Sequence, residues 1–159
     1  MTDTVIQTIL GYGLLSSLVF TGLLFVQYFL GSERSVRDEE GNFDRRRGGP
    51  LALVMLLLML SLIMGIPVIA SSAVRTTMGE PLAFATYFAI GYGIFFFVNL
   101  WDLVIIDYIL VVRFRPRAIK VPDTAYYNTM KPHVQGWFRG LIIGLVTSLI
   151  AALMAMVVL

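Results

Sequence analysis

The sequence predicts an all-α membrane protein with four transmembrane helices, and three observations lead to this fold class. Of the 159 residues, 58% are apolar and 14% are charged, against about 45–50% and about 25% in soluble domains. The mean hydropathy is +0.83. The apolar residues gather in four long runs, each near or above the roughly 20 residues that a spanning helix needs. We therefore expect residues 1–159 to form a single four-helix transmembrane domain whose surplus apolar surface faces lipid.

The four expected spans follow one another along the whole chain. They cover about residues 5–30, 51–72, 82–112 and 140–159. Charged segments at 31–49 and 113–135 form the first and third loops, and about ten residues join the second span to the third. Pro67 lies inside the second span and is expected to kink it. Such a kink serves either gating or, more commonly, shape.

Basic residues predict the orientation of the spans. Each charged loop holds five Lys or Arg residues, and Arg139 lies at the edge of the second loop, so one side has eleven of the twelve basic residues. Only Arg75 falls on the other side. By the positive-inside rule, both charged loops are cytoplasmic and both chain ends face outward.

Two segments of the chain share a spaced pattern that suggests an internal repeat. Gly11-Tyr12-Gly13 and Gly91-Tyr92-Gly93 are 80 residues apart, and residues 61–65 resemble residues 140–144 at an offset of 79. The protein would then consist of two repeated helical hairpins related by an axis along the membrane normal. The alternative is chance, because glycines and interfacial tyrosines recur in many membrane proteins.

Small residues recur every four positions in the fourth span, in the pattern of a glycine zipper. This spacing places them on one helix face, where another backbone can approach closely. The contact is either within the bundle or between subunits. The residues are Gly136, Gly140, Gly144, Ser148 and Ala152.

Polar residues inside the third span form a candidate intramembrane site. Asn99 and Asp102 lie about 60° apart on an α-helix, and Asp107 lies about 80° from Asn99 on the other side. All three can share one inward-facing sector. Arg139 enters the bilayer at the same edge, so we predict an Asp107–Arg139 pair that fixes helix register.

Asp102 lies deeper than any Lys or Arg in the sequence. Its expected partners are therefore neutral, such as Thr147, Ser148 or water, and we expect Asp102 to be protonated or to lie in a wet cavity. Ionisable residues within spans mark functional sites by default, and a purely structural role is the alternative.

A second candidate site lies at the membrane edge, before the fourth span. The only histidine, His133, follows Lys131, with Tyr126 and Tyr127 nearby. One histidine cannot build a His-rich metal site, the absence of cysteine removes thiolate ligands, and we expect no metal and no cofactor. A simple hydrogen-bonding role at the interface is the alternative for His133.

Basic residues of both loops are expected to contact anionic lipid headgroups. A run of three arginines is too short for nucleic-acid binding, so the predicted partners are lipids and other membrane proteins. The headgroup-binding candidates are Arg45, Arg46, Arg47, Arg113, Arg115, Arg117 and Lys120.

The stretch from Asn99 to Gly140 resembles a group of small, uncharacterised bacterial four-helix integral membrane proteins. The resemblance is carried by the run from Asn99 to Asp107, by Pro122, and by residues 133–136 followed by Gly140. It implies that Asp102, Asp107 and His133 belong to one site, and it carries no function.

Three functions fit the sequence. The first is a non-enzymatic interaction or accessory subunit, in a homo-oligomer or a larger membrane complex, because the helices pack closely and show no catalytic constellation. The second is a small transporter or proton-linked channel that uses Asp102. The third is a lipid-modifying enzyme with His133 as base and Asp107 orienting it. A bacterial inner membrane is the expected location.

Overall fold

The computed structural model describes residues 2–29, 50–115 and 128–159. These residues are helical almost throughout and contain no strand. The elements are α1 (Thr2–Phe29), α3 (Pro50–Met78), α4 (Phe84–Trp101), the π-helix η1 (Asp102–Phe114) and α6 (Met130–Val158).

Four helical stretches are long and apolar enough to cross a membrane, which indicates an integral membrane protein. They are Thr2–Val26, Leu56–Met78, Phe84–Phe114 and Met130–Val158. Over the described residues, the predicted all-α class with four membrane-spanning helices is therefore confirmed.

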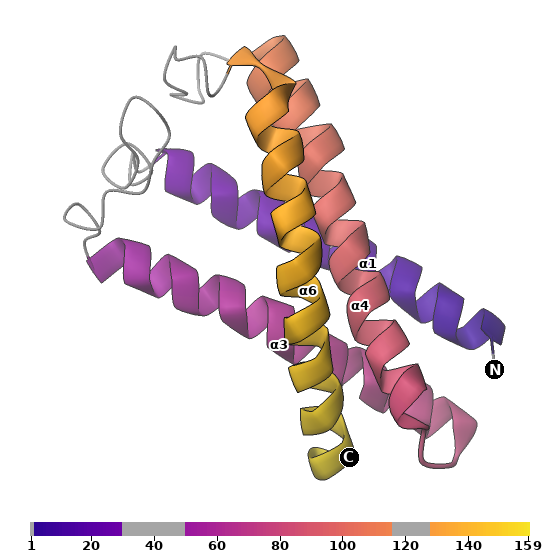
Figure 1. Ribbon diagram of the computed structural model, residues 1–159. Helices are drawn as coiled ribbons and strands as arrows, with labels where there is room; N and C mark the ends of the chain where they lie inside the picture. Colours follow the sequence, from indigo (N-terminus) through magenta and orange to yellow (C-terminus); the bar gives the residue numbers. More distant parts are fainter. Residues whose placement is uncertain (1, 30–49, 116–127) are drawn as a thin grey trace.

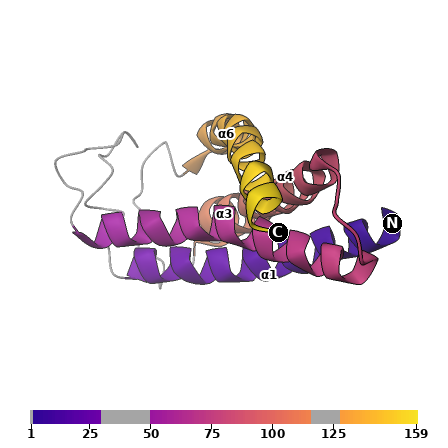
Figure 2. The same ribbon diagram turned by 90° about the horizontal axis from the view of Figure 1, so that it is seen from below.

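The helices form two hairpin layers that cross each other. Helices α1 and α3 lie side by side in one layer (Figure 2), and α4–η1 and α6 lie side by side in the other (Figure 1). The second pair runs obliquely across the first. Helix α4 packs against α1, α3 and α6, and α6 also packs against α3, so both helices of the second layer contact the first.

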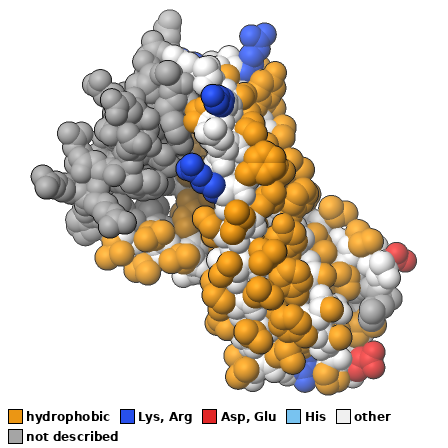
Figure 3. Space-filling model, in the orientation of Figure 1, with side chains coloured by type: hydrophobic (Ala, Val, Ile, Leu, Met, Phe, Trp, Pro, Cys, Tyr) orange, Lys and Arg blue, Asp and Glu red, His pale blue; other side chains and the backbone are white. Residues whose placement is uncertain are grey.

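The two ends of the molecule differ in charge. Helices α1 and η1 end, and α3 and α6 begin, toward the upper left of Figure 1, whereas both chain ends lie toward the opposite side. In Figure 3, Lys and Arg side chains gather around the end of η1 and the start of α6, and the acidic side chains lie at the far end. Hydrophobic side chains cover most of the surface between them, as expected of a protein that faces lipid.

Two helices are longer than the apolar runs that predict them. Helix α6 begins at Met130, ten residues before the expected span at 140, and α3 continues to Met78 rather than 72. Pro132 lies in the first turn of α6, where its missing N–H breaks no helical hydrogen bond. Hydropathy alone does not detect such polar helix ends.

A glycine closes α3 before the short connection to α4. Gly79 has a φ of +71°, and its N–H donates to the carbonyl oxygen of Arg75 at 2.9 Å. A left-handed glycine after the last helical residue is a common helix stop, because glycine has no Cβ to clash in that conformation.

The small-residue face of α6 contacts α4 within the same chain. A Cβ on Gly144 would overlap the Phe95 ring, and one on Gly140 would lie 2.7 Å from Asn99 Oδ1. Ser148 and Ala152 are buried further along the same face. Gly136 differs, because no described residue lies within 4 Å of the position that its Cβ would take.

Helices α1 and α4 contact each other at positions related by the proposed repeat. A Cβ on Gly13 would lie 2.9 Å from Phe97, and one on Gly93 would lie 2.8 Å from Ile9. The indole N–H of Trp101 donates to Thr21 Oγ1 at 3.1 Å, across a separation of 80 residues. The internal repeat stays a prediction, since contact between the two segments does not test their common origin.

Candidate functional site

The third membrane-crossing helix changes its winding at the candidate site. It is an α-helix up to Trp101 and a π-helix from Asp102 to Phe114. Hydrogen bonds in a π-helix join residues five apart, and such segments are rare and concentrate at functional sites. Neither proline nor glycine occurs from Asp102 to Phe114, so the sequence gives no local reason for the wider winding.

The π-helix places Asp102 and Asp107 one turn apart. On an α-helix, residues five positions apart diverge by about 140°, whereas in a π-helix they lie near the same face. The burial pattern agrees, because Ile106 and Val111, also five apart, are the buried residues of η1. The two carboxylates therefore share a side of the helix more closely than the α-helical spacing predicts.

The π-helix ends in a left-handed residue. Arg115 has a φ of 42°, and its backbone N–H donates to the carbonyl oxygen of Leu110 at 2.9 Å. This bond again joins residues five apart.

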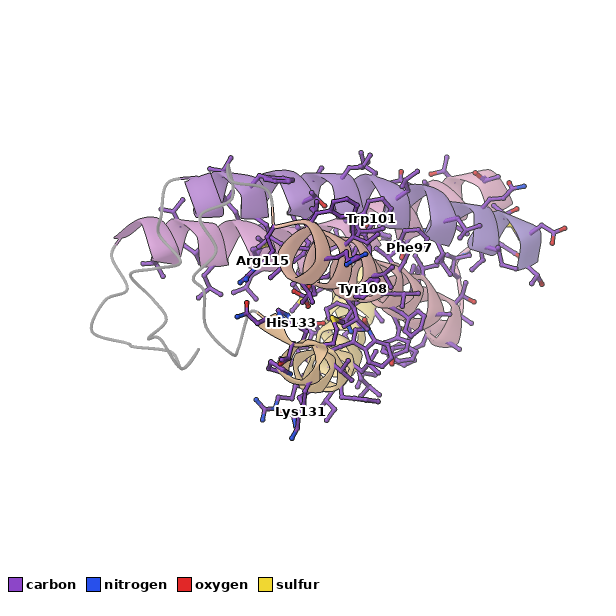
Figure 4. All side chains as sticks on the ribbon, turned by 90° about the horizontal axis from the view of Figure 1, so that it is seen from above. Phe97, Trp101, Tyr108, Arg115, Lys131 and His133 are labelled. Carbon is purple, nitrogen blue, oxygen red and sulfur yellow. The ribbon has the colours of Figure 1, made fainter. Side chains whose placement is uncertain are left out.

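The central interaction of the site joins η1 to α6. His133 Nδ1 lies 2.8 Å from Asp107 Oδ1, and the His133 side chain is buried while that of Asp107 is 20% exposed. Figure 4 shows His133 between the two helices and Lys131 on the outer side of α6. His133 reaches Asp107 because α6 extends ten residues beyond its apolar run.

The predicted Asp107–Arg139 pair is wrong. Asp107 pairs with His133, and Arg139 lies on the exposed face of α6 with no ion pair to Asp107. Six residues separate His133 from Arg139, which places them about 120° apart on an α-helix. Because His133 faces η1, Arg139 points away from η1.

Asn99 ties α4 to α6 one helical turn before Asp102. Its side-chain N–H donates to the backbone carbonyl of Trp137 at 3.2 Å. The close approach of Gly140 makes room for this amide. Among the described residues, the buried indole nitrogen of Trp137 has no hydrogen-bond acceptor, and its ring packs edge-on against Phe96 and Phe138.

Asp102 lies at a cavity of about 200 Å³ between α1, α3 and α4. Asn99 and Ser16 are the other polar side chains of its wall, and apolar residues make up the rest. A wet cavity at Asp102 was one of two expectations from the sequence. The walls that α1 and α3 supply were not predicted. Pro67 was the available signal, because a proline in a span often borders irregular packing. The apolar lining consists of Phe20, Met59, Leu62, Ile63, Pro67, Ile94, Phe95 and Val98.

Thr147 and Ser148 are not the partners of Asp102 that the sequence suggested. The Thr147 hydroxyl donates to the carbonyl oxygen of Gly144 in its own helix at 3.2 Å. Ser148 Cβ lies 3.5 Å from the position that a Cβ on Gly91 would take. Gly91 is eleven residues from Asp102, which corresponds to about 16 Å along the helix.

The remaining predicted residues lie at the basic end or outside the described ranges. Lys131 and Arg113 are exposed, and Arg115 is half-buried. The other candidates at the membrane edge and in the loops lie outside the described residues: Arg45, Arg46, Arg47, Arg117, Lys120, Tyr126 and Tyr127.

The chemistry available at the site is proton and hydrogen-bond chemistry. Within residues 2–29, 50–115 and 128–159, no three His, Asp or Glu side chains come together in a way that could hold a metal ion. The site holds two carboxyl groups and one imidazole, each able to take up and release a proton.

Comparisons with known proteins find no match. No protein-family model matches it, and neither a curated protein nor a solved structure does.

Proposed function

We propose that this protein is a small proton-linked membrane transporter that uses Asp102 as its proton-binding group. The observation that carries the proposal is a series of three titratable side chains, of which the last, Asp102, lines a cavity. His133 contacts Asp107, Asp107 follows Asp102 by one π-helical turn, and Asp102 lines the cavity. Chains of Asp, Glu and His within spanning helices are typical of proton relays.

The relay runs from the membrane edge inward. Asp107 is partly exposed and exchanges protons with water, His133 holds or passes the proton beside it, and Asp102 carries it at the cavity. In this proposal, the proton passes between the carboxyl groups of Asp107 and Asp102 along one π-helical turn, directly or through water. Two conformations of the hairpins would then expose Asp102 to opposite sides in turn.

The basic end of the molecule is the cytoplasmic end in this proposal. Four of the five basic residues in the described ranges lie around the end of η1 and the start of α6, which favours N-out and C-out topology by the positive-inside rule. The relay then opens to the cytoplasm, and a bacterial inner membrane supplies the proton gradient. The basic side chains there bind anionic headgroups.

The other two functions have weaker support. The close-packing helix face that suggests an accessory subunit or homo-oligomer contacts α4 of the same chain at Gly140 and Gly144, so these contacts do not call for a second protein. The Asp107–His133 pair has the geometry that an enzyme uses to orient a base. His133 is buried, however, so a lipid substrate would need the helices to part before reaching the imidazole, whereas a proton would not.

The test is proton movement in proteoliposomes that hold the full chain and a trapped pH-sensitive dye. With a potassium diffusion potential as the driving force, vesicles with the native protein should acidify faster than protein-free vesicles. Asp102→Asn should abolish the difference. Asp3→Asn is the matched control, because it makes the same change at an exposed carboxylate on α1 and should leave the rate unchanged.

The outcomes separate function from folding. Circular dichroism of both variants in the same lipid shows whether the helices persist. Equal proton flux in native and Asp102→Asn vesicles, with folding intact, would overturn the proposal.

A further inference from the structure

We propose that the cavity at Asp102 binds a hydrophobic organic cation with a body about the size of one aromatic ring. This inference rests on the proposed function, since it names the substrate class of the same site. It depends on the charge, the hydrogen-bonding character and the size of the cavity wall.

Among the described residues that line the cavity, none has a positively charged side chain. Asp102 is the one ionisable residue among the eleven that line the cavity, and no Lys, Arg or His is among them. A carboxylate attracts a cation more strongly among apolar side chains than it does in water. An anionic ligand finds no attractive charge in the wall.

Two residues of the wall, Ser16 and Ile63, supply oxygen acceptors. The Ser16 hydroxyl donates its hydrogen to the carbonyl oxygen of Tyr12 at 2.5 Å, so its lone pairs remain for a ligand. Pro67 has no N–H and removes the helical donor that the carbonyl oxygen of Ile63 would otherwise receive. Both Ile63 and Pro67 line the cavity. Oxygen acceptors favour a positively charged ligand.

The apolar part of the wall suits the body of such a cation. Phe20 of α1 and Phe95 of α4 are among the lining residues, and aromatic rings attract quaternary ammonium groups. Aliphatic side chains of α3 complete the wall. The volume of about 200 Å³ holds a single ring with a small cationic head.

Binding of the cation at Asp102 links its movement to that of the proton. A carboxyl group that holds a proton has no charge for the cation, so the two ligands exclude each other. Without the cation, Asp102 carries protons alone, and this is the flux that the diffusion potential drives. Exchange of one proton for one cation carries no net charge, so the cation present on both sides of the membrane should slow that flux.

The test compares two probes that differ only in charge. Phenyltrimethylammonium carries a quaternary nitrogen, and tert-butylbenzene has the same shape with carbon in its place. Calorimetric titration of the full chain in detergent, with empty micelles as the blank, should show binding of the cation. The neutral isostere should bind at least about tenfold more weakly.

Variants assign the binding to Asp102. Asp102→Asn should weaken cation binding at least about tenfold and leave binding of tert-butylbenzene unchanged, which shows that the cavity is intact. Asp3→Asn should alter neither. Phe20→Leu removes one aromatic face and should weaken the cation more than the isostere.

Each result bears on the proposal. Equal binding of the two probes, or no binding of the cation to the native protein, overturns it. Proton flux through Asp102 without cation binding overturns this inference and leaves the proposed function standing. Cation binding that needs Asp102, without proton flux, supports the site and overturns the proposed function.

Discussion

The interface between α4–η1 and α6 has two halves that are built on different principles. Toward the chain ends, α4 and α6 meet through small or apolar residues such as Ile90, Gly91, Ser148 and Ala152. Toward the basic end, the same two elements meet through polar groups, with Asn99 bonded to α6 and Asp107 paired with His133. The change occurs near Gly140 and Gly144.

The difference between the halves indicates a division of roles. Close packing of small residues is sufficient to hold two helices together in lipid, because it gives van der Waals contact without desolvating any charge. Carboxylates at the membrane edge are expensive to bury and are retained mainly where they serve a function. The apolar half therefore acts as the fixed part, and the polar half acts as the part that can take up protons and rearrange.

The largest expected effect comes from overpacking the boundary between the halves. Gly144→Val should lower the free energy of unfolding by about 3 kcal/mol, because its side chain would overlap the Phe95 ring. Gly136→Val is the matched control and should change stability by less than about 0.5 kcal/mol, since its Cβ meets nothing within 4 Å. Unfolding in mixed detergent micelles, followed by circular dichroism, measures both. Equal losses would show that the two glycines do not differ in packing.

The sequence predicts the apolar half well and the polar half incompletely. Four apolar runs are enough to predict four spanning helices, because lipid leaves the backbone few alternatives. The four-residue spacing in α6 likewise points to a close-packed face at Gly140 and Gly144, although at Gly136 in the same pattern no described residue lies within 4 Å of the Cβ position. The periodicity predicts which face of α6 is packed. It does not predict how far the partner helix, α4, extends along that face.

The polar half depends on features that have no sequence signature. The π-helix begins at Asp102 without a proline or glycine, and it changes the angle between the two carboxylates. The early start of α6 lies in a polar segment that hydropathy treats as loop, so His133 was placed at the interface and Arg139 was expected beside Asp107. Both differences come from helix geometry rather than from residue type.

The second prediction concerns the Asp107–His133 pair in the polar half of the interface. Asp107→Leu should lower the free energy of unfolding by about 2 kcal/mol, because a hydrogen bond to a charged group is lost and His133 stays buried. Asp107→Asn should cost less, because its amide oxygen can still accept from the Nδ1 hydrogen. Mixed-micelle unfolding of the two variants measures the difference. If leucine proves as stable as asparagine, the pair does not hold the helices together.

A smaller effect is expected at the polar contact beside Asp102. Asn99→Ala removes the donor to the carbonyl oxygen of Trp137 and should lower the free energy of unfolding by about 1 kcal/mol. Ser61→Ala is the control, because the Ser61 hydroxyl bonds only to Leu57 in its own helix and is exposed. Thermal unfolding of the two variants in one detergent checks the difference. A loss as large for Ser61→Ala would show that the contact between helices adds nothing.

The smallest effect should appear where the two hairpin layers meet, at the hydrogen bond from Trp101 to Thr21. A double-mutant cycle with Trp101→Phe and Thr21→Val isolates this bond from the packing that each substitution also disturbs. The expected coupling energy is about 0.6 kcal/mol, the average for side-chain hydrogen bonds between membrane helices. Half-unfolding points of the native protein, both single variants and the double variant give the value. A coupling near zero would mean that only packing holds α1 to α4, so the hairpins could shift against each other without breaking a specific bond. A clear coupling would show that a specific hydrogen bond holds α1 against the end of α4, directly before Asp102.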